Sequence, residues 1–188
     1  ARRAVVWSRT DRPARMLLEL RPAGHEPGAP PVFAGEIPVD GETDFTGRFA
    51  LEDLAPATRY RAVVRFVDEE ETVGPAETAS FRTAPPAGEA APVRLAWGGD
   101  LAGQGICRDA REGFPILGHV LAERPDLFVG LGDMIYADDV CHPVGPLGNP
   151  QVPGEFGPAA DLDGFRAHWR SVREDAALRI LLATTPYV

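Results

Sequence analysis

The chain has 188 residues, 44% of them hydrophobic and 25% charged, and its formal net charge is −9 from 19 basic and 28 acidic side chains. This is the composition of a globular protein. It lacks the basic stripe expected of a nucleic-acid binder and any apolar run near the roughly 18 residues of a membrane span. The acidic balance is still compatible with an anionic substrate, because a bound metal can supply positive charge.

Residues 1–84 are expected to form an all-β domain. Short apolar segments recur between turns, and the clearest cover residues 4–10, 15–20, 58–66 and 78–83. The third of these alternates apolar side chains with arginines, which is the pattern of a half-buried antiparallel strand. Several short strands at this spacing predict a β-sandwich, with Trp7 in its core.

A tyrosine at the start of the third segment makes the sandwich more specific. Residues 54–60 read L-x-P-x-T-x-Y, so that Tyr60 follows a proline turn directly. This is the tyrosine-corner arrangement, in which the phenol hydroxyl is tied to upstream backbone. The pattern resembles the fibronectin type III family, and the first domain is therefore expected to be a fibronectin III-like or immunoglobulin-like sandwich.

Residues 85–92 carry three prolines and no apolar periodicity, and are interpreted as a linker between two domains. The second domain is expected to cover residues 93–188 and to begin with a strand at 93–97, a helix at 114–123 and a strand at 126–131. Such a β-α-β unit predicts a parallel sheet. A loop at 142–160 and helices at 162–173 and 176–183 follow, with a third strand starting at 186. Two finished strands cannot bury both faces of a sheet, so we expect an incomplete α/β domain.

Each of the two predicted parallel strands ends in a glycine followed by an aspartate, Gly99-Asp100 and Gly132-Asp133. Ligands of open α/β sheets lie beyond the carboxyl ends of the strands, and glycine lets the backbone turn and a ligand approach. Two neighbouring carboxylates repel each other unless a cation lies between them. A pair of metal ions, which activates water and steadies phosphoryl oxygens, satisfies this arrangement.

The second strand continues as G-D-x-x-Y, with Asp133 and Tyr136 at its fixed positions. This motif resembles metallophosphoesterases, both purple acid phosphatases and PhoD-type alkaline phosphatases. Residues 113–136, with their E-x-P-D-L phrase at 123–127, favour PhoD. The first strand also lacks the second glycine of the G-D-x-G motif of purple acid phosphatases. The resemblance therefore predicts the front part of a PhoD-like enzyme.

The resemblance implies hydrolysis of phosphate monoesters or diesters by two or more metal ions. Asp133 would be the catalytic bridging ligand, Tyr136 the ferric ligand and Asp100 a ligand from the first strand. The metals implied are iron(III) with calcium or another divalent cation. Many PhoD relatives carry a cysteine where Asp100 stands, and this departure leaves the choice between the family's pair and another pair open, because an oxygen ligand tolerates harder cations than a thiolate does. The resemblance also implies a small phosphate-ester substrate and export to the periplasm or beyond by the twin-arginine route. With ligands missing downstream, the fragment alone is expected to be inactive.

Other interpretations of these residues stay open at this point. The chain could belong to a purple acid phosphatase-like enzyme, or to a non-catalytic β-sandwich module for adhesion or carbohydrate binding. Asp100 and Asp133 could be turn residues, and Tyr136 a buried aromatic. Cys107 and Cys141, expected on the same rim of the sheet, could form a disulfide, which we favour, or be free thiols or metal ligands. Asp138 and Asp139 are expected in a solvated loop, with contact to a metal as the alternative. His142 is expected to be a surface loop residue, or else to contact a phosphate or act as a general acid. We also expect His119 to pack on its helix, His168 to be exposed and Trp97 to lie in the core.

Overall fold

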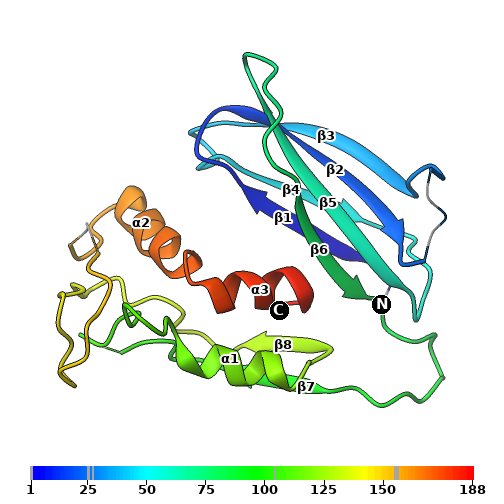
Figure 1. The fold of residues 1–188 in the computed structure, drawn as a ribbon. Helices are drawn as coiled ribbons and strands as arrows, with labels where there is room; N and C mark the ends of the chain where they lie inside the picture. The colour runs from blue at the N-terminus through cyan, green and yellow to red at the C-terminus, as the bar shows by residue number, and fades with distance from the viewer. Residues whose placement is uncertain (1, 25, 27, 104, 155–156) are drawn as a thin grey trace. The chain divides into compact units, whose positions relative to one another are not determined.

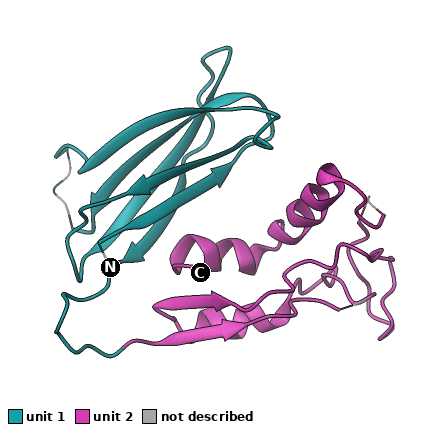
Figure 2. Cartoon of the chain, turned by 180° about the vertical axis from the view of Figure 1, so that it is seen from behind, with its two compact units in different colours: residues 1–92 teal, residues 93–188 magenta. Residues whose placement is uncertain are grey.

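A computed structural model describes residues 2–24, 26, 28–103, 105–154 and 157–188. The chain divides into two compact units, residues 1–92 and residues 93–188, coloured separately in Figure 2. Within the described ranges, no helix combines the length and apolar character needed to cross a bilayer.

The first unit consists of two antiparallel sheets (Figure 1). One sheet pairs β1 with β4, and the other has the strand order β3-β2-β5-β6. The strands are β1 (Ala4–Arg9), β2 (Ala14–Pro22), β3 (Phe33–Val39), β4 (Thr46–Leu51), β5 (Arg59–Asp68) and β6 (Glu77–Arg82). Strands β3 and β4 were not predicted, because glycine and polar residues interrupt their apolar pattern.

Alternate side chains of both sheets form one core. Met16, Leu18 and Leu20 on β2 are at most 1% exposed. Gly47 on β4 lies so close to them that an added Cβ would meet the Met16 sulfur at 2.5 Å, so the sheets pack tightly at this point. The core also contains residues of β1, β4 and β5, among them Val6, Phe49, Leu51, Tyr60, Ala62 and Val64.

The expectation for Trp7 was wrong, because this side chain is 42% exposed. Its neighbour Val6 is only 8% exposed and points into the core. Successive side chains of a strand point to opposite faces, so burial of Val6 turns Trp7 outward.

The hydrogen bond of the predicted tyrosine corner is confirmed. Tyr60 is 3% exposed, and its hydroxyl oxygen accepts the backbone N–H of Ala55 at 2.9 Å. The bond fastens the turn before β5 to the strand itself.

The second unit begins with the predicted β-α-β unit. Strands β7 (Leu95–Gly98) and β8 (Leu127–Gly130) are parallel, and α1 (Pro115–Ala122) connects them with its proline in the first turn. Tyr187 forms a parallel bridge to Phe128 on β8, and the backbone N–H of Gly130 donates to the carbonyl of Val188 at 2.8 Å. A third strand therefore starts beside β8, as expected.

Two further helices follow close to their predicted positions. Helix α2 (Leu162–Arg173) is capped by the side chain of Asp161, and α3 (Ala176–Thr184) by that of Asp175. The unit has its own core, formed by Phe114, Leu117, Phe128, Met134, Leu178 and Leu181.

Three expectations about single side chains were wrong. Trp97 is 66% exposed, because on β7 it is Ala96 that packs against the core. His168 is buried at 5% exposure, and its Nε2 lies 3.1 Å from the carbonyl oxygen of Gly157. His119 is exposed on α1.

Candidate metal centre

The two candidate aspartates follow neighbouring strands that run in the same direction. Gly98 of β7 is paired with Gly130 of β8, and the N–H of Leu131 donates to the Gly98 carbonyl at 2.8 Å. Asp100 and Asp133 each come shortly after these paired positions. Both therefore leave the sheet at the same edge, as the sequence predicted.

The two turns approach each other closely where they leave the sheet. A Cβ added at Gly99 would meet the carbonyl oxygen of Gly132 at 3.1 Å. The N–H of Leu101 donates to the carbonyl of Asp133 at 3.1 Å. Gly132 has φ +115°, which residues with a side chain rarely adopt. Glycine is therefore favoured at position 99 by the close approach of the other turn and at position 132 by its backbone conformation.

Both aspartates have the left-handed backbone conformation, with φ 50° at Asp100 and 50° at Asp133. Few residues other than glycine adopt it, although aspartate and asparagine are enriched there. Both residues are exposed. The turns thus present two carboxylates to solvent.

Tyr136 joins this pair directly. Its hydroxyl donates to Oδ1 of Asp100 at 2.7 Å. This hydrogen bond, together with desolvation and the negative charges of Asp100 and Asp133, raises the pKa of Tyr136 to about 12. The structure therefore brings Asp100 and Tyr136 into contact, with Asp133 within electrostatic range of the phenol.

The chemistry of this trio suits a hard cation. Its donors are two carboxylates and a phenol, and oxygen ligands suit hard divalent cations. Without a cation, the phenol proton is what joins Tyr136 to Asp100. Among the described residues, however, no group of three or more His, Cys, Asp or Glu side chains could hold a metal ion. These three residues alone therefore do not complete a metal site.

The two cysteines form a disulfide, Cys107–Cys141, as favoured from the sequence. It connects the segment after β7 with the segment after β8, and it leaves neither sulfur as a free thiol or as a thiolate ligand.

Asp139 is not the solvated loop residue that was expected. Its Oδ1 accepts the N–H of Val140 at 2.7 Å, and its Oδ2 accepts the N–H of Gly105 in the other segment. Its carboxylate therefore holds the loops together. Asp138 and His142 are exposed in the same loop.

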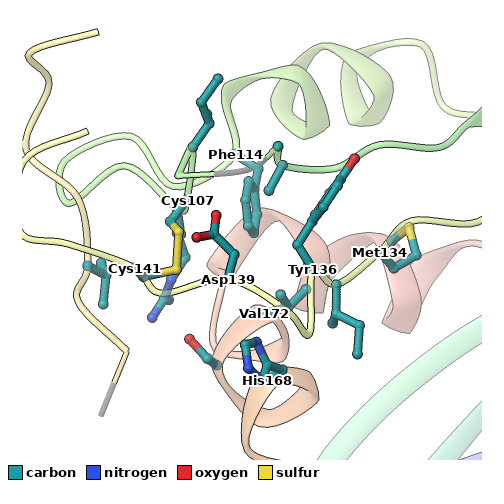
Figure 3. Close-up of a pocket in the computed structure, with 15 residues that line it drawn as sticks. Cys107, Phe114, Met134, Tyr136, Asp139, Cys141, His168 and Val172 are labelled. Carbon is teal, nitrogen blue, oxygen red and sulfur yellow. A yellow bond between two sulfur atoms is a disulfide. The ribbon is translucent and has the colours of Figure 1, made fainter. Parts of the chain in front are cut away.

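A small cavity lies beside the disulfide (Figure 3). Its volume is about 40 Å³, and its lining is mostly apolar, including Phe114, Met134 and Val172. Tyr136 and His168 also line it. A volume of this size accommodates water rather than a phosphate ester.

Sequence reasoning missed Gln151, a buried polar residue of the loop that precedes α2. It is 2% exposed, and its side chain hydrogen-bonds to backbone groups on both sides of the disulfide. Its position within a Gly- and Pro-rich loop gave no signal of burial.

The second unit, in which a Gly-Asp pair follows each of the two parallel strands, is matched by a known protein family. The family model described as PhoD-like phosphatase matches residues 95–188, and the chain therefore belongs to the PhoD-like phosphatase family. This confirms the resemblance seen in the sequence.

Solved structures agree on the fold. The structure of PhoD matches with a TM-score of 0.75 and 20% identity over 98% of this chain and 35% of that chain. Purple acid phosphatase PPD1 from seeds of yellow lupin (Lupinus luteus) matches with a TM-score of 0.62 and 13% identity over 99% of this chain and 32% of that chain. The chain thus spans about a third of each of these proteins. No curated protein sequence matches it.

Proposed function

We propose that this chain contributes the first part of a metal-dependent phosphoesterase that hydrolyses phosphate monoesters or diesters. The observation that carries the proposal is the contact of Tyr136 with Asp100, beside Asp133, at the carboxyl ends of two parallel strands. Membership in the PhoD-like phosphatase family supports the same reaction class. The substrate is a small phosphate ester.

In this proposal each member of the trio has a distinct role. Asp133 would hold both metal ions, Tyr136 would hold the ferric ion, and Asp100 would be a ligand from the first strand. Bound metal ions polarise phosphoryl oxygens and lower the pKa of water. Tyr136 would hold the ferric ion as a phenolate, and Asp100 Oδ1, which accepts the Tyr136 hydroxyl proton in the metal-free protein, would then be available as a ligand.

The metals we propose are iron(III) with calcium or another divalent cation. The trio offers only oxygen atoms, and carboxylates suit calcium and other hard cations. The remaining ligands would come from parts of the enzyme beyond these three residues. The described residues alone are then expected to be inactive.

The arrangement of the first unit supports a fibronectin III-like sandwich over residues 1–84, with residues 85–92 as linker and 93–188 as the phosphatase part. A four-stranded sheet β3-β2-β5-β6 opposite the pair β1-β4 corresponds to strands C′-C-F-G opposite B-E of immunoglobulin-like sandwiches. The bond from Ala55 to Tyr60 matches their tyrosine corner.

We also propose that the protein is exported, to the periplasm or beyond, by the twin-arginine route. The Cys107–Cys141 disulfide supports export, because disulfides persist mainly in oxidising compartments.

The test compares Asp133→Ala with the unaltered full-length enzyme, by elemental analysis and by hydrolysis of p-nitrophenyl phosphate and its bis ester. We expect Asp133→Ala to lose bound metal and at least about 100-fold of activity, since even residues outside the ligand shell contribute 10–100-fold. Asp163→Ala, at an exposed aspartate of α2, is the matched control.

Full activity of Asp133→Ala would refute the proposal. An unaltered enzyme without metal would instead favour a non-catalytic binding module. The purple acid phosphatase alternative has the weaker support, because the family model is that of PhoD-like phosphatases.

A further inference from the structure

The candidate ligands lie on two long segments that contain little regular structure. Residues 99–113, after β7, carry Asp100, and residues 131–160, after β8, carry Asp133 and Tyr136. Close to the strands, the bond from Leu101 to Asp133 ties the segments together. Farther out, their relative position must be fixed by contacts between the loops themselves.

Gln151 makes such contacts with both segments. Its Oε1 accepts the N–H of Cys107 at 2.6 Å. Its Nε2 donates to the carbonyl of Gly105 at 3.1 Å and to that of His142 at 3.2 Å. One buried amide thus satisfies backbone groups of the first loop and of the second loop together.

The disulfide fastens the same chain positions covalently. Cys107 both bonds to Cys141 and donates to Gln151, and His142 directly follows Cys141. Gly145 packs directly against the side-chain amide of Gln151, since a Cβ at Gly145 would lie 2.7 Å from Cδ of Gln151. Figure 3 shows the disulfide near Asp139, whose carboxylate adds a bond between the loops.

We propose that Gln151 and the Cys107–Cys141 disulfide, together called the loop clamp, position the candidate metal ligands. Asp100 lies seven positions before Cys107, and Tyr136 lies five before Cys141. Fixing both loops at these points reduces the number of loop conformations in which Asp100 and Tyr136 are far apart. The geometry of metal sites depends on supporting residues of this kind. This inference rests on the proposed function.

The clamp residues are positioning residues, because they do not belong to the trio. Without the amide of Gln151, three partly buried backbone groups lose this partner, and the loops must rearrange to bring these groups to water. Without the disulfide, both loops gain conformational freedom. In each case the cost to the metal centre is lower affinity and a less uniform geometry.

The experiment titrates the full-length enzyme, stripped of metal, with Mn²⁺ alone and follows binding by electron paramagnetic resonance. Mn²⁺ suits oxygen ligands, and its spectrum reports the symmetry of the site as well as occupancy. The clamp variants are Gln151→Met, similar in length but without hydrogen bonds, and the double variant Cys107→Ser/Cys141→Ser. Leu117→Ala, which removes a buried side chain of α1, lowers stability without touching the clamp.

A fourth sample needs no substitution, so that the test survives a variant that does not fold. The unaltered enzyme is treated with a water-soluble phosphine, which is then removed. Both cysteine sulfurs become thiols, while the phosphine is oxidised and takes its oxygen from water. Among the described residues, the Cys107–Cys141 disulfide is what changes in this sample.

We expect the Mn²⁺ dissociation constant to rise at least tenfold, with an altered line shape, in both clamp variants and after reduction. Leu117→Ala should melt earlier but bind Mn²⁺ as the unaltered enzyme does. Unchanged affinity and line shape in the clamp variants and the reduced enzyme would overturn the clamp alone, as would an equal loss in Leu117→Ala. If the unaltered enzyme binds no Mn²⁺, the proposed function falls together with the clamp.

Discussion

Asp175 should be among the most sensitive single positions of the second unit, because its buried carboxylate serves two helices. It is 2% exposed. Its Oδ1 accepts the N–H of Leu178 at 2.8 Å in the first turn of α3, and its Oδ2 accepts the N–H of Phe114, just before α1, at 3.0 Å. Gly113 leaves room for it, since a Cβ there would clash with Oδ2.

Replacing Asp175 by alanine should lower the free energy of unfolding by about 2–4 kcal/mol. The lost helix cap contributes about 1 kcal/mol, and the buried N–H of Phe114, left without an acceptor, contributes about 1–3 kcal/mol. Asp161 caps α2 through a single bond to Gly164 at 2.8 Å and is exposed. Asp161→Ala should therefore cost only about 1 kcal/mol.

The assay is urea unfolding in a Trp7→Phe background, where the fluorescence comes from Trp97 and Trp169 of the second unit. Asp175→Asn provides a graded comparison, since its amide oxygen can still cap α3 but its nitrogen cannot accept from Phe114. If Asp175→Ala costs no more than Asp161→Ala, the reasoning from the two buried bonds is wrong.

Two further predictions concern the tyrosines. Asp100→Ala should lower the pKa of Tyr136 from about 12 toward 10.0. Ultraviolet titration of the metal-free protein measures this pKa, with Tyr136→Phe as the control that lacks the phenol. An unchanged pKa would show that Asp100 is not the cause. Because the folded pKa is raised, this phenol favours folding below pH 10.0, and that contribution disappears as the pH rises through about 12. Tyr60→Phe should cost the first unit about 1 kcal/mol through the lost bond to Ala55, and urea unfolding followed by Trp7 fluorescence checks it.

The sequence predicted those elements of the fold that local signals define. Period-two alternation marked β5, the proline in the first turn marked α1, and Asp161 marked the start of α2. Strands β3 and β4 were not predicted because glycine and polar residues interrupt their apolar pattern, although pairing of β3 with β2 and of β4 with β1 stabilises them. Trp7 and Trp97 were misplaced because large aromatic side chains were assumed to be buried, whereas the strand register turned both outward.

The candidate metal centre was only partly predictable. Two Gly-Asp pairs after parallel strands predicted that Asp100 and Asp133 leave the sheet at one edge, and the bond from Tyr136 to Asp100 adds a direct contact. The role of Gln151 could not be predicted, because its hydrogen bonds reach residues 46 and 9 positions away. Such bonds depend on how irregular loops fold together, and no local pattern encodes that.

At Asp100 and Asp133 the left-handed backbone conformation favours glycine, yet the chain has an aspartate at both positions. An ordinary L-residue in this conformation costs roughly 1–2 kcal/mol relative to the right-handed form, a penalty that glycine would avoid in either turn. Anyone redesigning the chain purely for thermal robustness would place glycine at both positions and would thereby delete two acids that face open solvent. This penalty falls twice, shortly after each of the two paired strands, and both times the residue that bears it is an aspartate.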